Sequence, residues 1–171
     1  MKKITALLLL MFTLMMTENT SYAQKKYDAN WQALNKRPVP TWFTDAKFGI
    51  FIHWGPYSVP AYGKKGTYSE WYQYDLARTP ETIAFHDKVY GADYSYYKFG
   101  EEFTADLFDA NEWATLFKQS GAQYIVPTSK HHDGYALWPS VEASKTFGFP
   151  WNSMEVGPKR DLLGELTTAV R

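Results

Sequence analysis

Two short apolar segments, each leading toward histidines, constrain what this chain can fold into. Residues 48–55 read Phe-Gly-Ile-Phe-Ile-His-Trp-Gly, and residues 124–128 read Tyr-Ile-Val-Pro-Thr. Neither segment alternates apolar and polar residues, a pattern typical of parallel strands that are covered on both faces. Apolar residues with helical spacing lie between the two segments and again after the second one. The resulting order of strand, helix, strand and helix predicts a parallel α/β fold.

The helical segments are marked by their ends. Residues 109–112, Asp-Ala-Asn-Glu, form a capping-box pattern, and Ser120-Gly121 is a typical helix end. Between them three apolar residues share one helical face: Trp113, Leu116 and Phe117. A further helix is predicted to start near Asp161, and short helices are predicted around 68–77 and 81–90 in an otherwise irregular connection over 56–103.

The N-terminus has the pattern of a secretory signal peptide. Lys2 and Lys3 precede the apolar stretch 4–16, and Ser21-Tyr22-Ala23 supplies small residues for cleavage before Gln24. A membrane span needs about 20 apolar residues, so the stretch is too short for an anchor. The sequence therefore predicts a signal peptide at 1–23 and a mature chain, 24–171, exported to the periplasm or the extracellular space without a membrane anchor.

Composition excludes several classes of function. The chain has 18 basic and 18 acidic residues, so no net positive field attracts nucleic acid. It has no cysteine, which excludes disulfides, thiolate metal sites and cysteine nucleophiles. The aromatic share is 18%, and such rings either fill a core or stack on sugars and bases.

Histidines follow both predicted strands. His53 lies at the end of the first, and His131 and His132 follow the second, while His86 lies in the connection. In parallel α/β barrels the carboxyl ends of the strands build the active site, so these three histidines are predicted to meet at one rim. Phe51 is predicted on the same face as His53, because strand side chains alternate with period two.

Two other sets of residues are candidate sites. The three histidines with Asp133 could form a zinc site, but His131 and His132 would point to opposite sides of a continued strand, and no His-x-His spacing occurs. Glu70 next to Trp71 combines a carboxylate with a stacking surface, which suits polyol recognition. The segment 63–66, Gly-Lys-Lys-Gly, does not match a phosphate-binding loop.

Four motifs in this order resemble one family: Phe48–Gly55, Glu70-Trp71-Tyr72, Lys130-His131-His132-Asp133-Gly134 and the 151–166 segment with Pro158-Lys159-Arg160-Asp161. They resemble the start of the catalytic domain of α-L-fucosidases, glycoside hydrolase family 29. The resemblance implies the N-terminal portion of a (β/α)8-like, TIM-type barrel that needs no cofactor. It also implies exo-acting hydrolysis of terminal α-linked L-fucose on glycans, with retention of anomeric configuration.

Six residues match the family's sugar-contacting positions: His53, Glu70, Trp71, His131, His132 and Phe51. The resemblance implies that the histidines hydrogen-bond fucose hydroxyls and that Glu70 and Trp71 line the same pocket. Phe51 would then form an apolar wall for the C5 methyl group of this 6-deoxy sugar.

No catalytic residue is assigned in this chain. A retaining glycosidase needs two carboxyl groups about 5–5.5 Å apart, and the resemblance places both beyond Arg171. Asp133 matches a non-nucleophilic aspartate, and Asp161 is predicted to be a helix N-cap. A barrel needs about 250 residues, so we expect the chain to be truncated and inactive by itself.

Two alternatives from other classes stay open at this point. A secreted carbohydrate-binding module would bind sugar saturably without hydrolysis. A metal-dependent hydrolase using His53, His131 and His132 would contain stoichiometric zinc and lose its activity to chelators.

Overall fold

The computed structural model describes residues 26–171, in two units. Of the first unit, residues 26–40 are described, and they contain α2 (Trp31–Leu34), whose Ala33 amide donates to the N-cap side chain of Asn30 over 2.8 Å. The second unit runs from Thr41 to Arg171. With η for 3₁₀ helices, it holds α3 (Thr41–Ala46), β1 (Gly49–Ile52), η1 (Pro56–Ser58), η2 (Ser69–Trp71), α4 (Tyr72–Asp75), α5 (Pro80–Val89), η3 (Tyr96–Lys98), α6 (Phe99–Glu102), α7 (Ala110–Gln119), β2 (Tyr124–Pro127), α8 (Val141–Phe147) and α9 (Leu162–Ala169).

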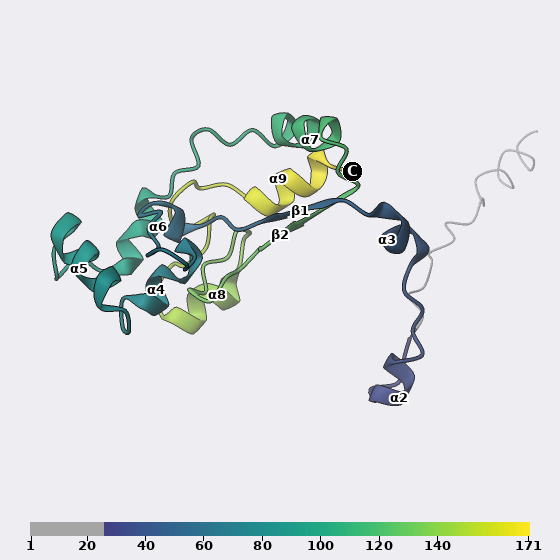
Figure 1. Cartoon of the computed structure of the whole chain (residues 1–171), viewed down its shortest axis with the longest axis horizontal. Coiled ribbons are helices and arrows are strands. Elements are labelled where there is room, and N and C mark those ends of the chain that lie inside the picture. The colour runs from purple at the N-terminus through teal and green to yellow at the C-terminus, as the bar shows by residue number, and fades with distance from the viewer. Residues whose placement is uncertain (1–25) are drawn as a thin grey trace, which may run out of the picture. The chain divides into compact units, whose positions relative to one another are not determined.

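The two strands form a parallel pair, as the sequence predicts. Gly49 pairs with Tyr124 and Ile52 with Pro127, so both strands end at the same edge. Figure 1 shows α7 and α9 side by side next to this pair. The α/β order of the prediction is therefore confirmed, with a two-stranded sheet in the described residues.

Local sequence signals determine where α7 and α9 begin. The Asp109 carboxylate accepts the amide of Asn111 at 2.8 Å, and the Asp161 carboxylate accepts the amide of Gly164 at 2.8 Å. Both N-cap predictions are confirmed, because each carboxylate satisfies amides that the first helical turn leaves unpaired. After α7, Gly121 has φ +85°, the left-handed conformation that glycine adopts readily.

The predicted helix forms as α7, and two of the three apolar residues on its predicted face are packed. Trp113 and Phe117 pack against the core, whereas Leu116 is 60% exposed. The Trp113 ring lies against the rings of Trp54 and Phe108, with centroids 5.2 and 4.9 Å away.

Within the described residues, one face of the strand pair is covered. Ile52 on β1 packs against the core, but Phe51, which points the other way, is 65% exposed. Alternation along the strand puts successive side chains on opposite faces, and the helices cover one of them. Within residues 41–171 the sheet is therefore open on the face of Phe51.

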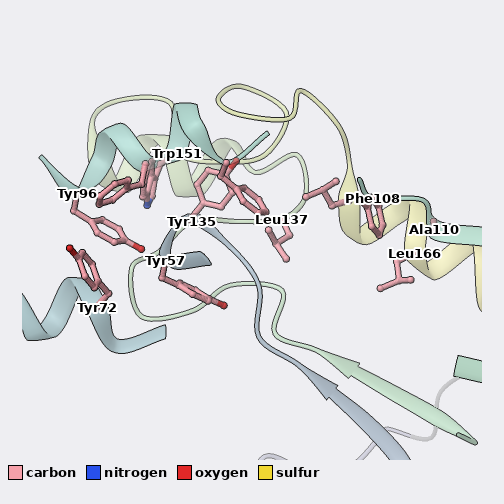
Figure 2. Packing of buried hydrophobic residues seen from close by; sticks show 12 residues of the cluster. Tyr57, Tyr72, Tyr96, Phe108, Ala110, Tyr135, Leu137, Trp151 and Leu166 are labelled. Atoms are coloured by element: carbon pink, nitrogen blue, oxygen red, sulfur yellow. The ribbon is translucent and has the colours of Figure 1, made fainter. Parts of the chain in front are cut away.

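Most of the core is aromatic, and the connection between the strands supplies much of it. The buried rings come from η1 through to the segment after α8, and Figure 2 labels several of them: Tyr57, Tyr72, Tyr96, Phe99, Phe103, Phe108, Tyr135 and Trp151. The short helices predicted around 68–77 and 81–90 are confirmed. The segment 56–103, predicted to be an irregular connection, therefore packs into the core through its aromatic side chains.

Trp151 is buried and contacts rings on both sides of it in the sequence, among them Tyr96 and Phe147. Its ring centroid is 5.0 Å from that of Tyr135 and 5.1 Å from that of Tyr97, both at steep angles. Gly100 lies against the indole so closely that a Cβ there would be 2.6 Å from a Trp151 ring carbon. The core therefore depends on one large side chain and on a glycine that makes room for it.

We predict that Trp151→Ala lowers the free energy of unfolding by about 3–5 kcal/mol, since it leaves a cavity among rings that cannot collapse onto it. Urea denaturation followed by circular dichroism measures the change. Leu107→Ala is the control, because Leu107 is 95% exposed and its loss should change stability by less than about 0.5 kcal/mol. Equal effects of the two substitutions would contradict this description of the core.

Candidate functional site

Three histidines meet beyond the carboxyl ends of the strands. The ring centroids of His53 and His131 are 5.5 Å apart, and those of His131 and His132 are 4.8 Å apart. The predicted meeting of the three histidines at one rim is confirmed. His86 lies elsewhere: it is buried, and its ring bonds the Tyr72 hydroxyl and the Tyr94 carbonyl oxygen.

The helical connection brings an aromatic wall to the same place. The Trp71 ring, at the end of η2, lies 4.5 Å from the His132 ring and 5.6 Å from the His131 ring. Glu70 precedes it and is half-buried. Its negative charge opposes the lowering of the pKa of His131. Residues from three separate segments thus form one cluster.

Phe51 extends this cluster along β1. Its ring stacks on the His53 ring with centroids 5.3 Å apart and an interplanar angle of 24°. The two side chains share a face, as the period-two alternation predicts. The cluster therefore combines an apolar ring on β1 with the polar imidazoles that follow the two strands.

The prediction that His131 and His132 point to opposite sides is wrong. Strand β2 ends at Pro127, and the Gly134 amide bonds the His131 carbonyl over 3.0 Å. The histidines therefore lie in a turn, where the alternation of a strand no longer applies. This turn brings the two imidazoles edge to face instead of separating them.

Asp133 holds this turn in the core. Its carboxylate is buried and accepts the Tyr96 hydroxyl at 2.7 Å and the Tyr135 amide at 3.1 Å. The Trp151 indole N–H donates to the Asp133 carbonyl over 2.7 Å. Burial raises the pKa of the carboxyl above its usual range, while the hydrogen bond from Tyr96 opposes the rise. Asp133 thus anchors the two histidines before it to the aromatic core.

Neighbouring groups set the charge of His131. Burial lowers its pKa below the usual value, and positive charge on His132 or His53 lowers it further, while Glu70 opposes the change. The imidazole is therefore neutral at neutral pH. A neutral imidazole offers one N–H donor and one acceptor, which is what a sugar hydroxyl needs from a partner.

One contributor to this cluster was missed in the sequence. Tyr57, on η1, is buried with its ring centroid 5.4 Å from that of His131. Its only signal is the Gly55-Pro56 turn after the first strand, which marks a change of direction but not a contact. Long-range packing, which no local pattern encodes, places this ring beneath the histidines.

The described residues also bear on the zinc alternative and on a membrane span. Within 26–171, no three histidine, aspartate or glutamate side chains come close enough together to hold a metal ion.

None of the helices in that range is long and apolar enough to cross a membrane. The predicted signal peptide, 1–23, lies outside the described residues.

Comparison with known proteins gives one consistent result. Residues 14–171 match the family described as alpha-L-fucosidase. The chain is 44% identical over 168 residues to alpha-L-fucosidase of Dictyostelium discoideum, covering 96% of this chain and 35% of that protein. It superimposes with TM-score 0.78 and 45% identity on the crystal structure of Thermotoga maritima alpha-fucosidase in complex with fucose, covering 85% of this chain and 35% of that one.

A more distant structure agrees. An alpha-L-fucosidase from Bacteroides thetaiotaomicron, trapped as a covalent intermediate, matches with TM-score 0.57 and 32% identity over 79% of this chain and 28% of its own. The chain spans about a third of the length of the curated relatives it matches.

The neighbours of His131 should shift its titration in opposite directions. We predict that His132→Gln raises the pKa of His131, because it removes a neighbouring positive charge, and that Glu70→Gln lowers it, because it removes a negative one. Histidine ring signals followed by NMR against pH measure both shifts. His86, which lies outside the cluster, is the internal reference, and shifts of the same sign in both variants would contradict the described electrostatics.

Proposed function

Because the chain belongs to the alpha-L-fucosidase family, we propose that its histidine cluster binds the L-fucose unit of fucosylated glycans. In this proposal the chain forms the N-terminal part of a barrel-type catalytic domain. The whole protein is a retaining exo-α-L-fucosidase that releases terminal α-linked L-fucose. The substrate contacts are His53, Glu70, Trp71, His131, His132 and Phe51.

One observation carries this proposal. Side chains from three separate segments meet at the carboxyl edge of a parallel strand pair, with His131 in contact with both His53 and Trp71. Such edges are where parallel α/β enzymes bind their ligands. A cluster that packs imidazoles against an indole combines hydrogen-bonding groups with a stacking face, the two contacts that a sugar ring requires.

The chemistry of the cluster fits a deoxy sugar. The imidazoles and Glu70 supply donors and acceptors for the hydroxyl groups, and Phe51 supplies an apolar ring for the methyl group at C5. A site that hydrogen-bonds each hydroxyl discriminates strongly against sugars that lack one, because its buried partners are left unpaired. The cluster therefore favours L-fucose over sugars of other shape.

The reaction itself needs groups that this cluster does not supply as a pair. Retention proceeds through a glycosyl-enzyme intermediate formed by one carboxylate and assisted by a second, and the Bacteroides relative trapped as a covalent intermediate supports the same course here. Asp133 is buried on Tyr96, and Asp161 caps α9. We therefore propose a binding role for Glu70 and assign no nucleophile in this chain.

Binding of free L-fucose tests the proposal directly. We predict that the chain binds L-fucose and that His53→Ala or Trp71→Ala weakens binding by roughly ten- to a hundredfold, through loss of a hydrogen bond or of the stacking face. Titration calorimetry measures the affinities. L-galactose, which adds a hydroxyl at C6, should bind more weakly because Phe51 faces that position.

The matched control is Trp42→Ala. Trp42 is also an exposed indole, 59% against 36% for Trp71, and it lies against Tyr124 at the start of β2, the opposite end of the strands. Its removal should leave L-fucose binding unchanged. Equal loss of binding in the Trp42 and Trp71 variants would contradict the placement of the sugar at the histidine cluster.

Export is a separate proposal, supported by the basic start, the apolar stretch 4–16 and the small residues before Gln24. Expression with the native N-terminus should give protein outside the cytoplasm with the mass of a chain that begins at Gln24. Intact-mass spectrometry of the secreted or periplasmic fraction checks this. Replacing Ala23 with a bulky residue should retain the precursor, and a full-length mass in the wild-type fraction would refute the proposal.

A further inference from the structure

Tyr74 lies one ring beyond the histidine cluster. It belongs to α4, and its ring centroid is 5.6 Å from that of Trp71, with an interplanar angle of 79°. Trp71 in turn lies 4.5 Å from the His132 ring and 5.6 Å from the His131 ring. The aromatic surface at the site therefore continues past the residues that the proposed function assigns to L-fucose.

The helical segment 69–75 explains why these two rings are neighbours. Trp71 ends η2, and Tyr74 lies three positions later in α4, so both side chains fall on one face of the segment. Tyr72 turns the other way and is completely buried in the core. Trp71 and Tyr74 are 36% and 49% exposed. One ring thus anchors the segment, while the other two are open to a ligand.

Arg78 holds the Tyr74 ring in place. Its guanidinium carbon is 4.0 Å from the ring centroid, and its Nη1 donates to the Tyr74 carbonyl oxygen over 3.4 Å. A guanidinium at this distance is attracted to the face of the ring. Because Arg78 and Trp71 both contact the ring, Tyr74 is ordered before a ligand arrives, and binding costs less conformational entropy.

The row of ring contacts is longer than one sugar unit needs. Each ring contacts the next in the order Phe51, His53, His131, Trp71 and Tyr74. A pyranose ring is similar in size to a single aromatic ring, so one fucose unit cannot cover the whole row. The end of the row at Tyr74 is therefore left for a neighbouring group of the same ligand.

We propose that Tyr74 and Arg78 bind the neutral sugar unit to which the fucose is attached. This inference rests on the proposed function, which places the fucose itself against Trp71 and the histidines. The apolar C–H face of the second sugar packs on the Tyr74 ring, as pyranose rings do on aromatic side chains. Tyr74 and Arg78 thus make the chain prefer a fucosylated glycan to free L-fucose.

Arg78 also supplies the polar contact that a second sugar needs. Its side chain is exposed, and within residues 26–171 the guanidinium makes no hydrogen bond other than the one to Tyr74. A guanidinium has five N–H donors, so the remaining ones can donate to a hydroxyl group or to an acetamido oxygen. Galactose and N-acetylglucosamine both offer such acceptors beside an apolar ring face.

Comparing fucosylated disaccharides with free L-fucose tests the proposal in the 171-residue chain. The probes are L-fucose α-linked to O2 of D-galactose and L-fucose α-linked to O6 of N-acetyl-D-glucosamine, and titration calorimetry measures each affinity. At least one disaccharide should bind about three- to tenfold more tightly than L-fucose, which is the gain expected from one aromatic contact. Tyr74→Ala should bring this affinity ratio close to one, whereas Tyr74→Phe, which keeps the ring, should preserve it.

Phe43→Ala is the matched control. Phe43 is 50% exposed, against 49% for Tyr74, and its ring contacts Tyr124 at the start of β2, the end of the strands away from the histidines. Its removal should leave the ratio at the wild-type value. An equal fall of the ratio in the Phe43 and Tyr74 variants would overturn the assignment of the second sugar to α4.

The outcomes separate this inference from the proposed function. If the wild-type chain binds L-fucose but binds neither disaccharide more tightly, the inference is wrong and the proposed function stands, a result that needs no variant to fold. A wild-type preference that survives Tyr74→Ala also overturns the inference. If the chain binds neither L-fucose nor the disaccharides, the proposed function is contradicted together with the inference that rests on it.

Discussion

The buried carboxylate of Asp133 is the constraint on which the site depends. A carboxylate taken out of water is costly unless it is fully bonded, so the fold must bring donors to it. Tyr96 arrives from η3, Tyr135 follows in the same turn, and Trp151 donates to the carbonyl of the same residue. These three bonds tie the turn that contains His131 to the aromatic core. The position of the histidine cluster is therefore set by interactions that no sugar would touch.

Local signals were sufficient to predict the frame that carries the site. The two apolar segments predict the strands, and Asp109 and Asp161 predict where two helices start. These predictions succeed because a strand run or a helix N-cap depends on residues within about four positions of one another. The meeting of His53 with His131 needed one further premise, that parallel strands end at the same edge. The placement of Phe51 on the His53 ring followed from alternation alone.

What the sequence could not give depends on contacts across many positions. The segment 56–103 has little periodicity, yet it supplies Tyr72 and Phe99 to the core, and Gly100 is explained only by the indole of Trp151. The wrong orientation predicted for His131 and His132 has a related cause. Alternation was extended past Pro127, where the chain leaves the strand and turns. Tyr57 was missed because burial beneath a site leaves no mark in its neighbours along the chain.

The electrostatics of the cluster suit a neutral ligand. Burial lowers the pKa of His131, and positive charge on His132 or His53 lowers it further, so this imidazole is neutral at neutral pH. A neutral imidazole can both donate and accept, whereas an imidazolium can only donate. A hydroxyl group also does both, so a neutral His131 can match a sugar hydroxyl without having to strip water from a cation. The one carboxylate of the cluster, Glu70, opposes the lowering at His131 and so keeps its pKa from falling further. The pKa of His131 therefore reflects a balance between burial with two neighbouring histidines and the negative charge of Glu70, and in the proposed function this balance leaves the imidazole neutral beside a sugar hydroxyl.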